Sequence, residues 1–341
     1  MGGLLVLLLM VMTLSVCLGA VSIPLDAFFS IVGARLGLNS HHNFLPRQEA
    51  VLWVLRFPRT ILAMLIGAGL ATSGAAFQGL FRNPLAEPGL IGISSGASLF
   101  AVAMIVLEVG IFQQLTGYLG YYALSVAAFI GACLTTFMVY RLSIRHGKAD
   151  IASLLLVGIA MNALAGAFIG LMTYMATDEQ LRTITFWSLG SLGGATWQSV
   201  FTVMPFIGIP LLVLPFLAKS LNAFSLGDAT ARHMGINTNQ VKRNVIILAT
   251  MAVGGSVAVA GIIGFIGLII PHMIRMAFSA DHRLVIPGSA LLGASVLTGA
   301  DLLARTVASP AELPIGIVTS LIGVPVFIYI IVNQKKRNSD D

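Results

Sequence analysis

Charged residues are scarce in this chain of 341 residues. Asp, Glu, Lys and Arg make up 9% of the sequence and hydrophobic residues make up 57%, whereas soluble domains carry about 25% charged residues. The mean hydropathy is +0.95. These values exclude a soluble globular domain and predict an all-α polytopic membrane protein.

Cysteine is also rare, since only Cys17 and Cys133 are present, each inside an apolar run. Two isolated thiols predict neither a disulfide framework nor a metal-binding knuckle, and we expect no metal site. No basic patch lies beside aromatic residues or a nucleic-acid motif. The net charge of +6 therefore does not predict nucleic-acid binding.

No catalytic motif is recognisable. The phosphate-binding pattern G-x-x-x-x-G-K-[ST] fails at Gly147-Lys148, because Leu142 takes the first glycine position and Ala149 follows the lysine. The pattern H-E-x-x-H is missing as well. We therefore expect a protein that is not an enzyme and binds no cofactor. Work driven by ATP and Mg²⁺ would need an ATPase on a separate chain.

Long apolar stretches predict about ten transmembrane helices, each of which needs roughly 20 residues. They lie near residues 3–23, 58–80, 90–108, 118–140, 151–175, 197–217, 285–304 and 314–332, and a longer region covers about 244–280. We divide the longer region near Gly261, because glycine permits a broken helix. No Lys or Arg precedes the first stretch, so we expect a retained helix there. Residues 1–341 are predicted to form a single transmembrane domain.

Basic residues predict which ends of the helices face the cytoplasm. With ten spans and an inside N-terminus, thirteen of the 19 Lys and Arg residues fall in inner loops or in the C-terminal tail. This agrees with the positive-inside rule. Both termini are therefore predicted to be cytoplasmic.

The segment FRNPLAEPGLIGISSGAS, residues 81–98, interrupts the apolar pattern. Pro84 and Pro88 lack the N–H that a helix interior requires, and Asn83 suits a tight turn. Irregular backbone at membrane depth survives only where it is buried in protein or lines a cavity. This segment is therefore predicted to belong to a pathway or gate.

The longest inner loop, residues 219–244, predicts two short helices. Asp228 is expected to cap the first, which would run through Met234 and stop at Gly235. The second would start at Asn237 or Thr238. The loop is either a docking surface for a cytosolic partner or a solvated connector, and the pattern alone leaves both open.

Arg56 and Arg59 flank Pro58 at the outer end of the second span. They would anchor to headgroups, pair with Glu49, or dock acidic residues of an external partner. Asp301 and Arg305 lie four residues apart, a spacing that predicts a salt bridge within a helix.

Five stretches together resemble one family, the FecCD-type permeases of binding-protein-dependent ABC importers for iron chelates, haem and vitamin B12. They are RFPRT at 56–60, GAGLATSGAAFQGLFRNPLAEPGLIGISSGAS at 67–98, LGDATARHMGI at 226–236, GFIGLIIPHMIR at 264–275 and AELPIGIVTSLIGVPVF at 311–327. The resemblance implies a type II ABC importer permease fold. It also implies a homodimer with the substrate path on its axis, two ATP-binding-cassette ATPase subunits below, and one extracytoplasmic substrate-binding protein above.

The same resemblance implies roles for residues at three places. The cytoplasmic gate would comprise Asn83, Leu85, Ile151, Ala152 and Ser153. The ATPase-coupling loop, about residues 219–243, would act through Leu221, Leu226, Gly227, Asp228, Arg232 and Gly235. The binding protein would dock on Arg56, Arg59 and Arg305.

Substrate choice within the family depends on smaller similarities. FWSLGSLGGATW, residues 186–197, together with GLFRNPLAEPGLIGISSGAS, residues 79–98, is more similar to haem permeases than to siderophore permeases. Ile151-Ala152 stand where some vitamin B12 permeases have Thr-Ser, which disfavours that substrate. Haem is therefore the expected cargo, with vitamin B12 and ferric siderophores as alternatives.

An ion-coupled secondary transporter is the alternative from another class. Such proteins usually place acidic residues within the membrane. Here Glu108 and Asp301 lie near the ends of predicted spans, and no acid lies near a span centre. The pattern therefore favours the ATP-driven importer.

Overall fold

The computed structural model describes residues 1–19, 21–37, 44–107, 120–145 and 147–337. This part is almost entirely helical, with one short antiparallel hairpin of β1 (Ile144–Arg145) and β2 (Lys148–Ala149). The helices are α1 (Gly2–Cys17), α2 (Leu25–Arg35), α3 (Pro46–Ala50), η1 (Val51–Arg56), α4 (Phe57–Phe81), η2 (Pro88–Ile91), α5 (Ile93–Leu107), η4 (Gly120–Tyr122), α7 (Ala123–Leu142), α8 (Ile151–Met175), α9 (Asp178–Leu189), α10 (Trp197–Val213), η5 (Leu214–Leu217), α11 (Ala218–Phe224), α12 (Asp228–His233), α13 (Thr238–Ala260), α14 (Ile266–Ala277), α15 (His282–Thr306) and α16 (Ile315–Arg337). The all-α prediction is confirmed.

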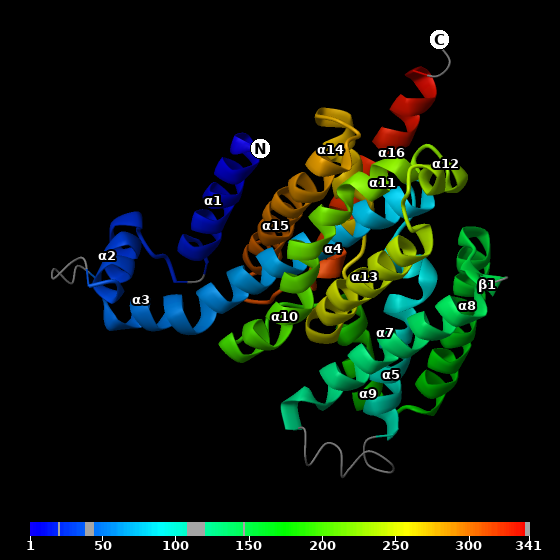
Figure 1. Ribbon diagram of the computed structural model, residues 1–341. Coiled ribbons are helices and arrows are strands. Elements are labelled where there is room, and N and C mark those ends of the chain that lie inside the picture. Colours follow the sequence, from blue (N-terminus) through cyan, green and yellow to red (C-terminus); the bar gives the residue numbers. More distant parts are fainter. Residues whose placement is uncertain (20, 38–43, 108–119, 146, 338–341) are drawn as a thin grey trace.

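Ten helical segments correspond to the ten predicted spans. Within the described residues, 6 helices are long and apolar enough to cross a membrane: the continuous helices 46–81 and 197–224, together with α7, α8, α13 and α15. Shorter apolar helices α1, α5, α14 and α16 supply the rest. α1 starts and α16 ends at the same end of the bundle, as an even number of spans requires (Figure 1).

The N-terminal boundaries differ from the prediction. α1 ends at Cys17 rather than near residue 23, and α2 and α3 follow it, neither of which was predicted. α3 continues through the π-helical η1 into α4, so one helix runs from residue 46 to 81. Hydropathy missed these pieces because α2 is too short for a span and α3 is polar. The apolar side of α2 packs with Val16 and Leu52 in a small separate core.

The region after the coupling loop also differs from the prediction. Asn237 caps α13, because its side-chain oxygen accepts the backbone N–H of Gln240 at 3.1 Å. The predicted helix start at Asn237 or Thr238 is therefore confirmed, but the expected short length is wrong, since this helix is a span that ends at Ala260. The predicted break near Gly261 is confirmed: Gly261 has φ of 70° and α14 starts only at Ile266. The amphipathic helix α9 was not predicted.

Helix α4 lies at the centre of the bundle and is mostly buried. It approaches α15 where Gly67 faces Gly293, because a Cβ on Gly67 would lie 2.3 Å from the carbonyl oxygen of Gly293. It approaches α14 even more closely, where a Cβ on Gly74 would lie 1.8 Å from the carbonyl oxygen of Gly267. Small residues permit such backbone contacts between membrane helices. These contacts hold α4, the helix that leads into the predicted gate turn, in position.

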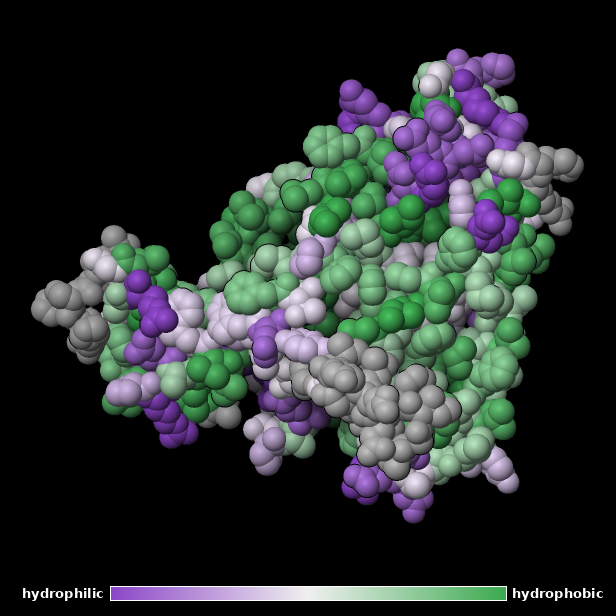
Figure 2. Space-filling view, turned by 60° about the horizontal axis from the view of Figure 1, so that its bottom comes forward, coloured by the Kyte–Doolittle hydropathy of each residue, from purple (hydrophilic) through white to green (hydrophobic). Residues whose placement is uncertain are grey.

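The surface divides into apolar and polar zones. Hydrophobic residues cover much of the face in Figure 2, and hydrophilic residues gather towards its edges. Exposed apolar side chains are numerous on α7, α8, α10 and α16. This distribution suits a protein whose sides contact lipid and whose ends contact water.

Candidate functional site

The segment after α4 forms the compact turn that the sequence predicts. α4 ends at Phe81, and Arg82 adopts a left-handed conformation with φ of 52°. The side-chain oxygen of Asn83 accepts the backbone N–H of Leu85 at 2.9 Å, which closes an Asx turn. Leu85 is 47% exposed, and the chain returns to the bundle at Pro88. Asn83 and Leu85 therefore lie on an open surface.

The second predicted gate segment is the first turn of α8. Asp150 caps this helix, because its carboxylate accepts the backbone N–H of Ser153 at 2.8 Å. Ser153 is buried, Ile151 is half-buried and Ala152 is exposed. Sequence reasoning missed Asp150, although an Asp directly before an apolar run is a helix-start signal.

The chain that follows the first gate turn is attached to α8. Asn162 on α8 donates a hydrogen bond from Nδ2 to the carbonyl oxygen of Gly89 at 3.2 Å. Gly158 lets η2 lie against α8, because a Cβ there would lie 2.2 Å from the carbonyl oxygen of Leu90. The two predicted gate segments are thus joined through residues 89–90. Asn162, a polar residue in an apolar helix, was the missed signal.

α8 leaves most of its surface uncovered within this chain. Leu156 is 68% exposed and Tyr174 is 89% exposed. Gly166 and Gly170 form a G-x-x-x-G pattern, and a Cβ on either would meet nothing within 4 Å. This pattern is typical of close helix packing in membranes. The open side of α8 therefore offers either a pathway lining or a contact with another subunit.

The predicted coupling loop consists of α11, α12 and the turns between them. Leu221 is fully buried, so its side chain holds the loop to the bundle, whereas Leu226 is 62% exposed. Gly227 and Gly235 have φ of 107° and 81°, respectively, which favour glycine. The predicted stop is confirmed to within one residue, because the helix ends at His233, Met234 is its C-cap and Gly235 follows. The predicted cap is wrong, because the helix starts at Asp228 and Gly227 is its capping residue.

Asp228 instead makes two ion pairs. Its carboxylate lies 3.0 Å from Arg232 and 3.3 Å from the Nζ of Lys242. Lys242 is 4% exposed and also donates from Nζ to the carbonyl oxygen of Ala149 at 3.0 Å. It thereby joins the start of α12 to the chain just before α8. Sequence reasoning treated Lys242 only as an inner positive charge, because nothing in the pattern indicates a partner 93 residues away.

The end of α4 reaches the same place. A Cβ on Gly227 would lie 3.8 Å from a guanidinium nitrogen of Arg82. The turn with Asn83 and Leu85, the start of α12 and the start of α8 therefore meet at one end of the bundle. This arrangement allows a movement of α12 to reach both predicted gate segments.

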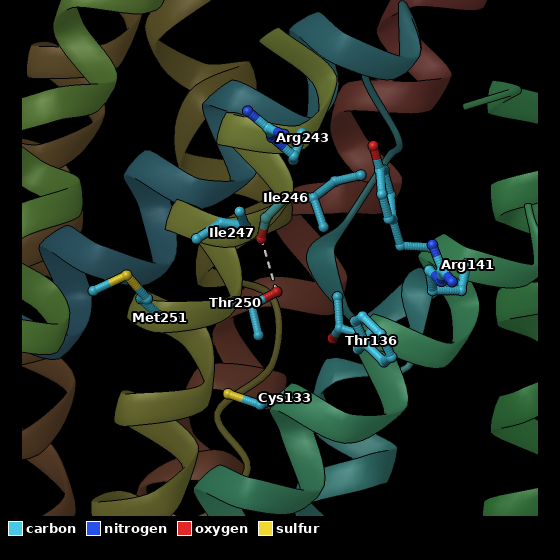
Figure 3. A pocket seen from close by; sticks show the side chains of 10 residues that line it. Cys133, Thr136, Arg141, Arg243, Ile246, Ile247, Thr250 and Met251 are labelled. Atoms are coloured by element: carbon cyan, nitrogen blue, oxygen red, sulfur yellow. Dashed lines mark hydrogen bonds between the residues drawn. The ribbon is translucent and has the colours of Figure 1, made fainter. Parts of the chain in front are cut away.

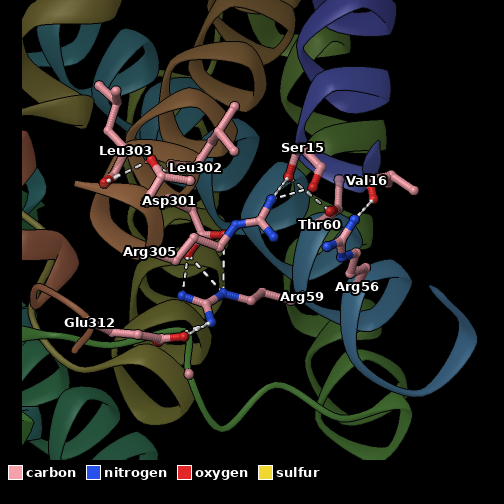
Figure 4. A network of polar contacts seen from close by, with 12 residues as sticks. Ser15, Val16, Arg56, Arg59, Thr60, Asp301, Leu302, Leu303, Arg305 and Glu312 are labelled. Carbon is pink, nitrogen blue, oxygen red and sulfur yellow. Dashed lines mark hydrogen bonds and ion pairs between the residues drawn. The ribbon is translucent and has the colours of Figure 1, made fainter. Parts of the chain in front are cut away.

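The predicted arginines at the other end of the bundle form a network (Figure 4). Arg59 lies 2.9 Å from Asp301 and 2.8 Å from Glu312. Arg305 lies 3.7 Å from Asp301, which confirms the predicted salt bridge within α15. Its Nη2 also donates to the hydroxyl of Ser15 at 3.0 Å. The Asp301 side chain is only 1% exposed, and two arginines compensate its buried charge.

Arg56 has a different environment. It is 5% exposed, and it donates to the carbonyl oxygens of Val16 at 2.5 Å and Cys17 at 2.8 Å, and also to that of Val21. These groups lie at and just beyond the end of α1, where helix carbonyls lack partners within the helix. The expected alternatives of headgroup anchoring and pairing with Glu49 do not describe this position, because Arg56 caps α1 instead. The most exposed charge of the network is Glu312, at 46%.

Comparison with known proteins shows the family to which the chain belongs. A model of the FecCD transport family matches residues 7–333. The chain belongs to the FecCD transport family. The match includes both predicted gate segments, the coupling loop and the outer arginines.

Known proteins are similar to this chain over most of its length. The hemin transport system permease protein HmuU of Yersinia pestis is 46% identical over 290 residues, covering 84% of this chain and 85% of that protein. The vitamin B12 import system permease protein BtuC of Klebsiella pneumoniae is 38% identical over 335 residues, covering 98% and 94%. A solved structure described as an inward-facing conformation of a metal-chelate type ABC transporter has a TM-score of 0.84 and 31% identity, covering 97% of this chain and 98% of that chain. The protein is therefore a multi-pass membrane permease of the ABC importer type.

Proposed function

We propose that this chain is the permease subunit of an ATP-driven importer that carries haem across the cytoplasmic membrane. The observation that carries the choice of haem is the 46% identity to a hemin permease over 84% of the chain. The similarity of residues 186–197 to haem permeases supports the same substrate. The chain itself is not an enzyme in this proposal, because ATP and Mg²⁺ are used by partner subunits.

The proposed assembly has two copies of this chain, two ATPase subunits and one extracytoplasmic substrate-binding protein. The uncovered side of α8, with Gly166 and Gly170, supports a pathway along a dimer axis. Exposed Leu226 on the coupling loop supports docking of an ATPase at the cytoplasmic end. Both termini and residues 219–243 would then face the cytoplasm, and the whole chain would act as one permease domain.

The binding protein would dock at the outer network of Arg56, Arg59 and Arg305. Arg59 is the most exposed of the three, at 13%, and exposed Glu312 is one of its partners. An acidic residue of the binding protein would replace Glu312 on Arg59 and leave the buried pair with Asp301 intact. Arg56 would support this surface by holding the end of α1.

The transport cycle would alternate between outward-open and inward-open states. Nucleotide shifts such an equilibrium only through different affinities for the two states. ATP binding would close the ATPase pair and push α12, and the ion pair of Asp228 with Lys242 would carry that displacement to the start of α8. Asn83, Leu85, Ile151, Ala152 and Ser153 would then open or close the cytoplasmic gate.

Vitamin B12 is the second candidate cargo, because a B12 permease is 38% identical over 98% of the chain. Ferric siderophores remain a further alternative within the family. A secondary transporter is disfavoured, because Asp301 is already paired with Arg59 and Arg305 near the end of α15. Glu108 lies outside the described residues.

The decisive experiment measures uptake into proteoliposomes that contain this permease, its ATPase and its binding protein. Haem, cobalamin and a ferric siderophore are offered separately, with and without ATP. We expect ATP-dependent accumulation of haem alone. Accumulation of cobalamin or the siderophore instead would overturn the substrate, whereas uptake that is indifferent to ATP would overturn the importer mechanism.

A further inference from the structure

A groove of about 390 Å³ lies between α7 and α13, and one end of it reaches Arg243, the last residue of the predicted coupling loop. Phe137 and Cys133 of α7 form one wall, and Ile247 and Met251 of α13 form the other. Its volume falls within the usual range for sites that bind small molecules, about 300 to 1,000 Å³. Most of its lining is apolar and belongs to helices that span the membrane.

Two arginines lie at one end of the groove. Figure 3 shows Arg141 on α7 and Arg243 on α13, with Cys133 towards the opposite end. Both arginines are exposed, and none of the ion pairs among the described residues involves either of them. Arg141 lies over the ring of Phe137 at 5.9 Å, which orients its guanidinium beside the groove. Two unpaired guanidinium groups at a membrane interface favour a phosphate.

A buried hydroxyl in the same groove has no partner. Thr136 is 4% exposed, and its Oγ1 makes no hydrogen bond within the described part of the chain. Thr250, which also lines the groove, donates to the carbonyl oxygen of Ile246 at 2.7 Å in the usual manner of helical threonines. Buried hydroxyl groups normally have partners. Because this oxygen is itself covered by the protein, a molecule in the groove reaches it only after the Thr136 side chain turns toward the groove, and such a molecule would then supply the acceptor.

The spacing of these groups matches one kind of molecule. Thr136 and Arg141 lie five residues apart on α7, a rise of about 7 to 8 Å along the helix axis. In a phospholipid, the ester carbonyls lie at a similar distance from the phosphate, and the hydrocarbon chains follow the esters. We propose that this groove binds one anionic phospholipid, with its phosphate between Arg141 and Arg243, an ester carbonyl on Thr136, and an acyl chain along Phe137, Ile247 and Met251.

Native mass spectrometry of the delipidated permease in a nonionic detergent tests this site. Phosphatidylglycerol and phosphatidylcholine of the same acyl composition are titrated separately. We expect one phosphatidylglycerol to bind about thirtyfold more tightly than phosphatidylcholine, since each arginine near an anionic headgroup adds to the affinity. R141Q/R243Q should abolish this preference. K148Q/R283Q, which removes the same charge from exposed positions outside the groove, should retain it.

Thr136→Val provides a second, independent readout. It removes the hydroxyl with little change of volume, so it should weaken both lipids by a similar factor and leave their ratio unchanged. An equal loss of preference in R141Q/R243Q and K148Q/R283Q would overturn the site, because it would mean only general charge attraction. Displacement of phosphatidylglycerol by one equivalent of haem would also overturn it, since the groove would then belong to the cargo.

Discussion

At the scale of single residues, Arg56 illustrates how burial changes the interpretation of a charge. The sequence places it beside Pro58 at an outer helix end, where docking to a partner was the expectation. The structure shows a guanidinium that satisfies carbonyl groups at the end of α1. Its first effect is therefore on the stability of the N-terminal region, whatever it adds to docking.

We expect Arg56→Met to lower the free energy of unfolding by about 2 kcal/mol or more, because buried carbonyl groups lose their donor. Thermal unfolding in detergent, followed by intrinsic fluorescence, measures this change. Arg47→Met, at an exposed position, should change stability by less than about 0.5 kcal/mol. Unchanged stability in Arg56→Met together with lost binding-protein affinity would show that docking is its main role.

Glu87 gives a prediction on pH dependence. Burial raises the pKa of its carboxyl group above the usual range. The folded protein therefore holds this proton more tightly than the unfolded chain, and stability falls as the pH rises from the ordinary Glu range through the raised pKa. We expect Glu87→Gln to raise the unfolding temperature at pH 8 and to change it little at pH 4. An equal shift at both pH values would contradict this explanation.

The matched control for Glu87 is Glu179→Gln, since Glu179 is exposed at the start of α9. It should leave the unfolding temperature nearly unchanged at both pH values. A pH-dependent shift in this variant would attribute the effect to overall charge rather than to burial.

At the scale of elements, the contact of Lys242 with Asp228 and Ala149 connects α12 to α8. We expect Lys242→Met to reduce haem uptake per ATP hydrolysed about tenfold, a typical size for the coupling between two sites. The methionine fills a similar volume but provides no ionic link. Uptake and ATPase activity are measured in the same proteoliposomes.

Arg283→Gln is the control for this prediction, because Arg283 is exposed, lies outside the coupling loop and makes no ion pair among the described residues. It should retain nearly normal coupling. Equal uncoupling in both variants, or a parallel loss of ATPase activity in Lys242→Met, would contradict a specific link through Lys242.

The uncovered glycines of α8 make the second prediction at this scale. G166L/G170L should weaken association of two permease copies, because bulky side chains prevent close approach of backbones. Mass photometry of the purified permease in detergent measures the dimer fraction. Gly208→Leu on α10 is the control, because a Cβ there likewise meets nothing within 4 Å, and it should leave the dimer fraction unchanged. An equal fall of the dimer fraction in both variants would place the subunit contact elsewhere.

The sequence predicted some elements better than others for physical reasons. α8 matches the predicted 151–175 at both ends, because Asp150 caps an uninterrupted apolar run. α13 starts before the predicted start near residue 244. Its first turns carry Lys242 and Arg243, so their mean hydropathy is too low to be predicted as part of a span. α2 and α9 were missed because short amphipathic helices lack a membrane-length signal.

At the scale of the whole molecule, the proposed gate is formed by two copies of the chain. With Cys17 and Cys133 first replaced by alanine, cysteines at Leu85 and Ile151 should crosslink across the dimer axis in one nucleotide state. Gel mobility after oxidation measures the crosslink with and without ATP. Leu226→Cys, on the coupling loop, should not join two permease copies, and equal crosslinking at the gate in all states would contradict nucleotide-controlled closure.

The candidate sites were predicted in outline at this scale, but their contacts were not. Motif spacing identified the turn at Asn83 and the loop at 226–236, because Pro, Asn and Gly determine local backbone. It could not show that Lys242 contacts Ala149 or that Arg56 contacts Val16, since these pairs arise only when distant helices pack. Tertiary partners therefore account for most of what the sequence left open.

The start of α1 and the end of α16 lie at the same end of the bundle (Figure 1). Two genes can therefore be fused head to tail, because the linker between copies would remain on one side of the membrane and need no added helix. Such a tandem protein allows one half to carry Lys242→Met while the other stays intact. It would show whether a single working connection per transporter is enough for a full turnover.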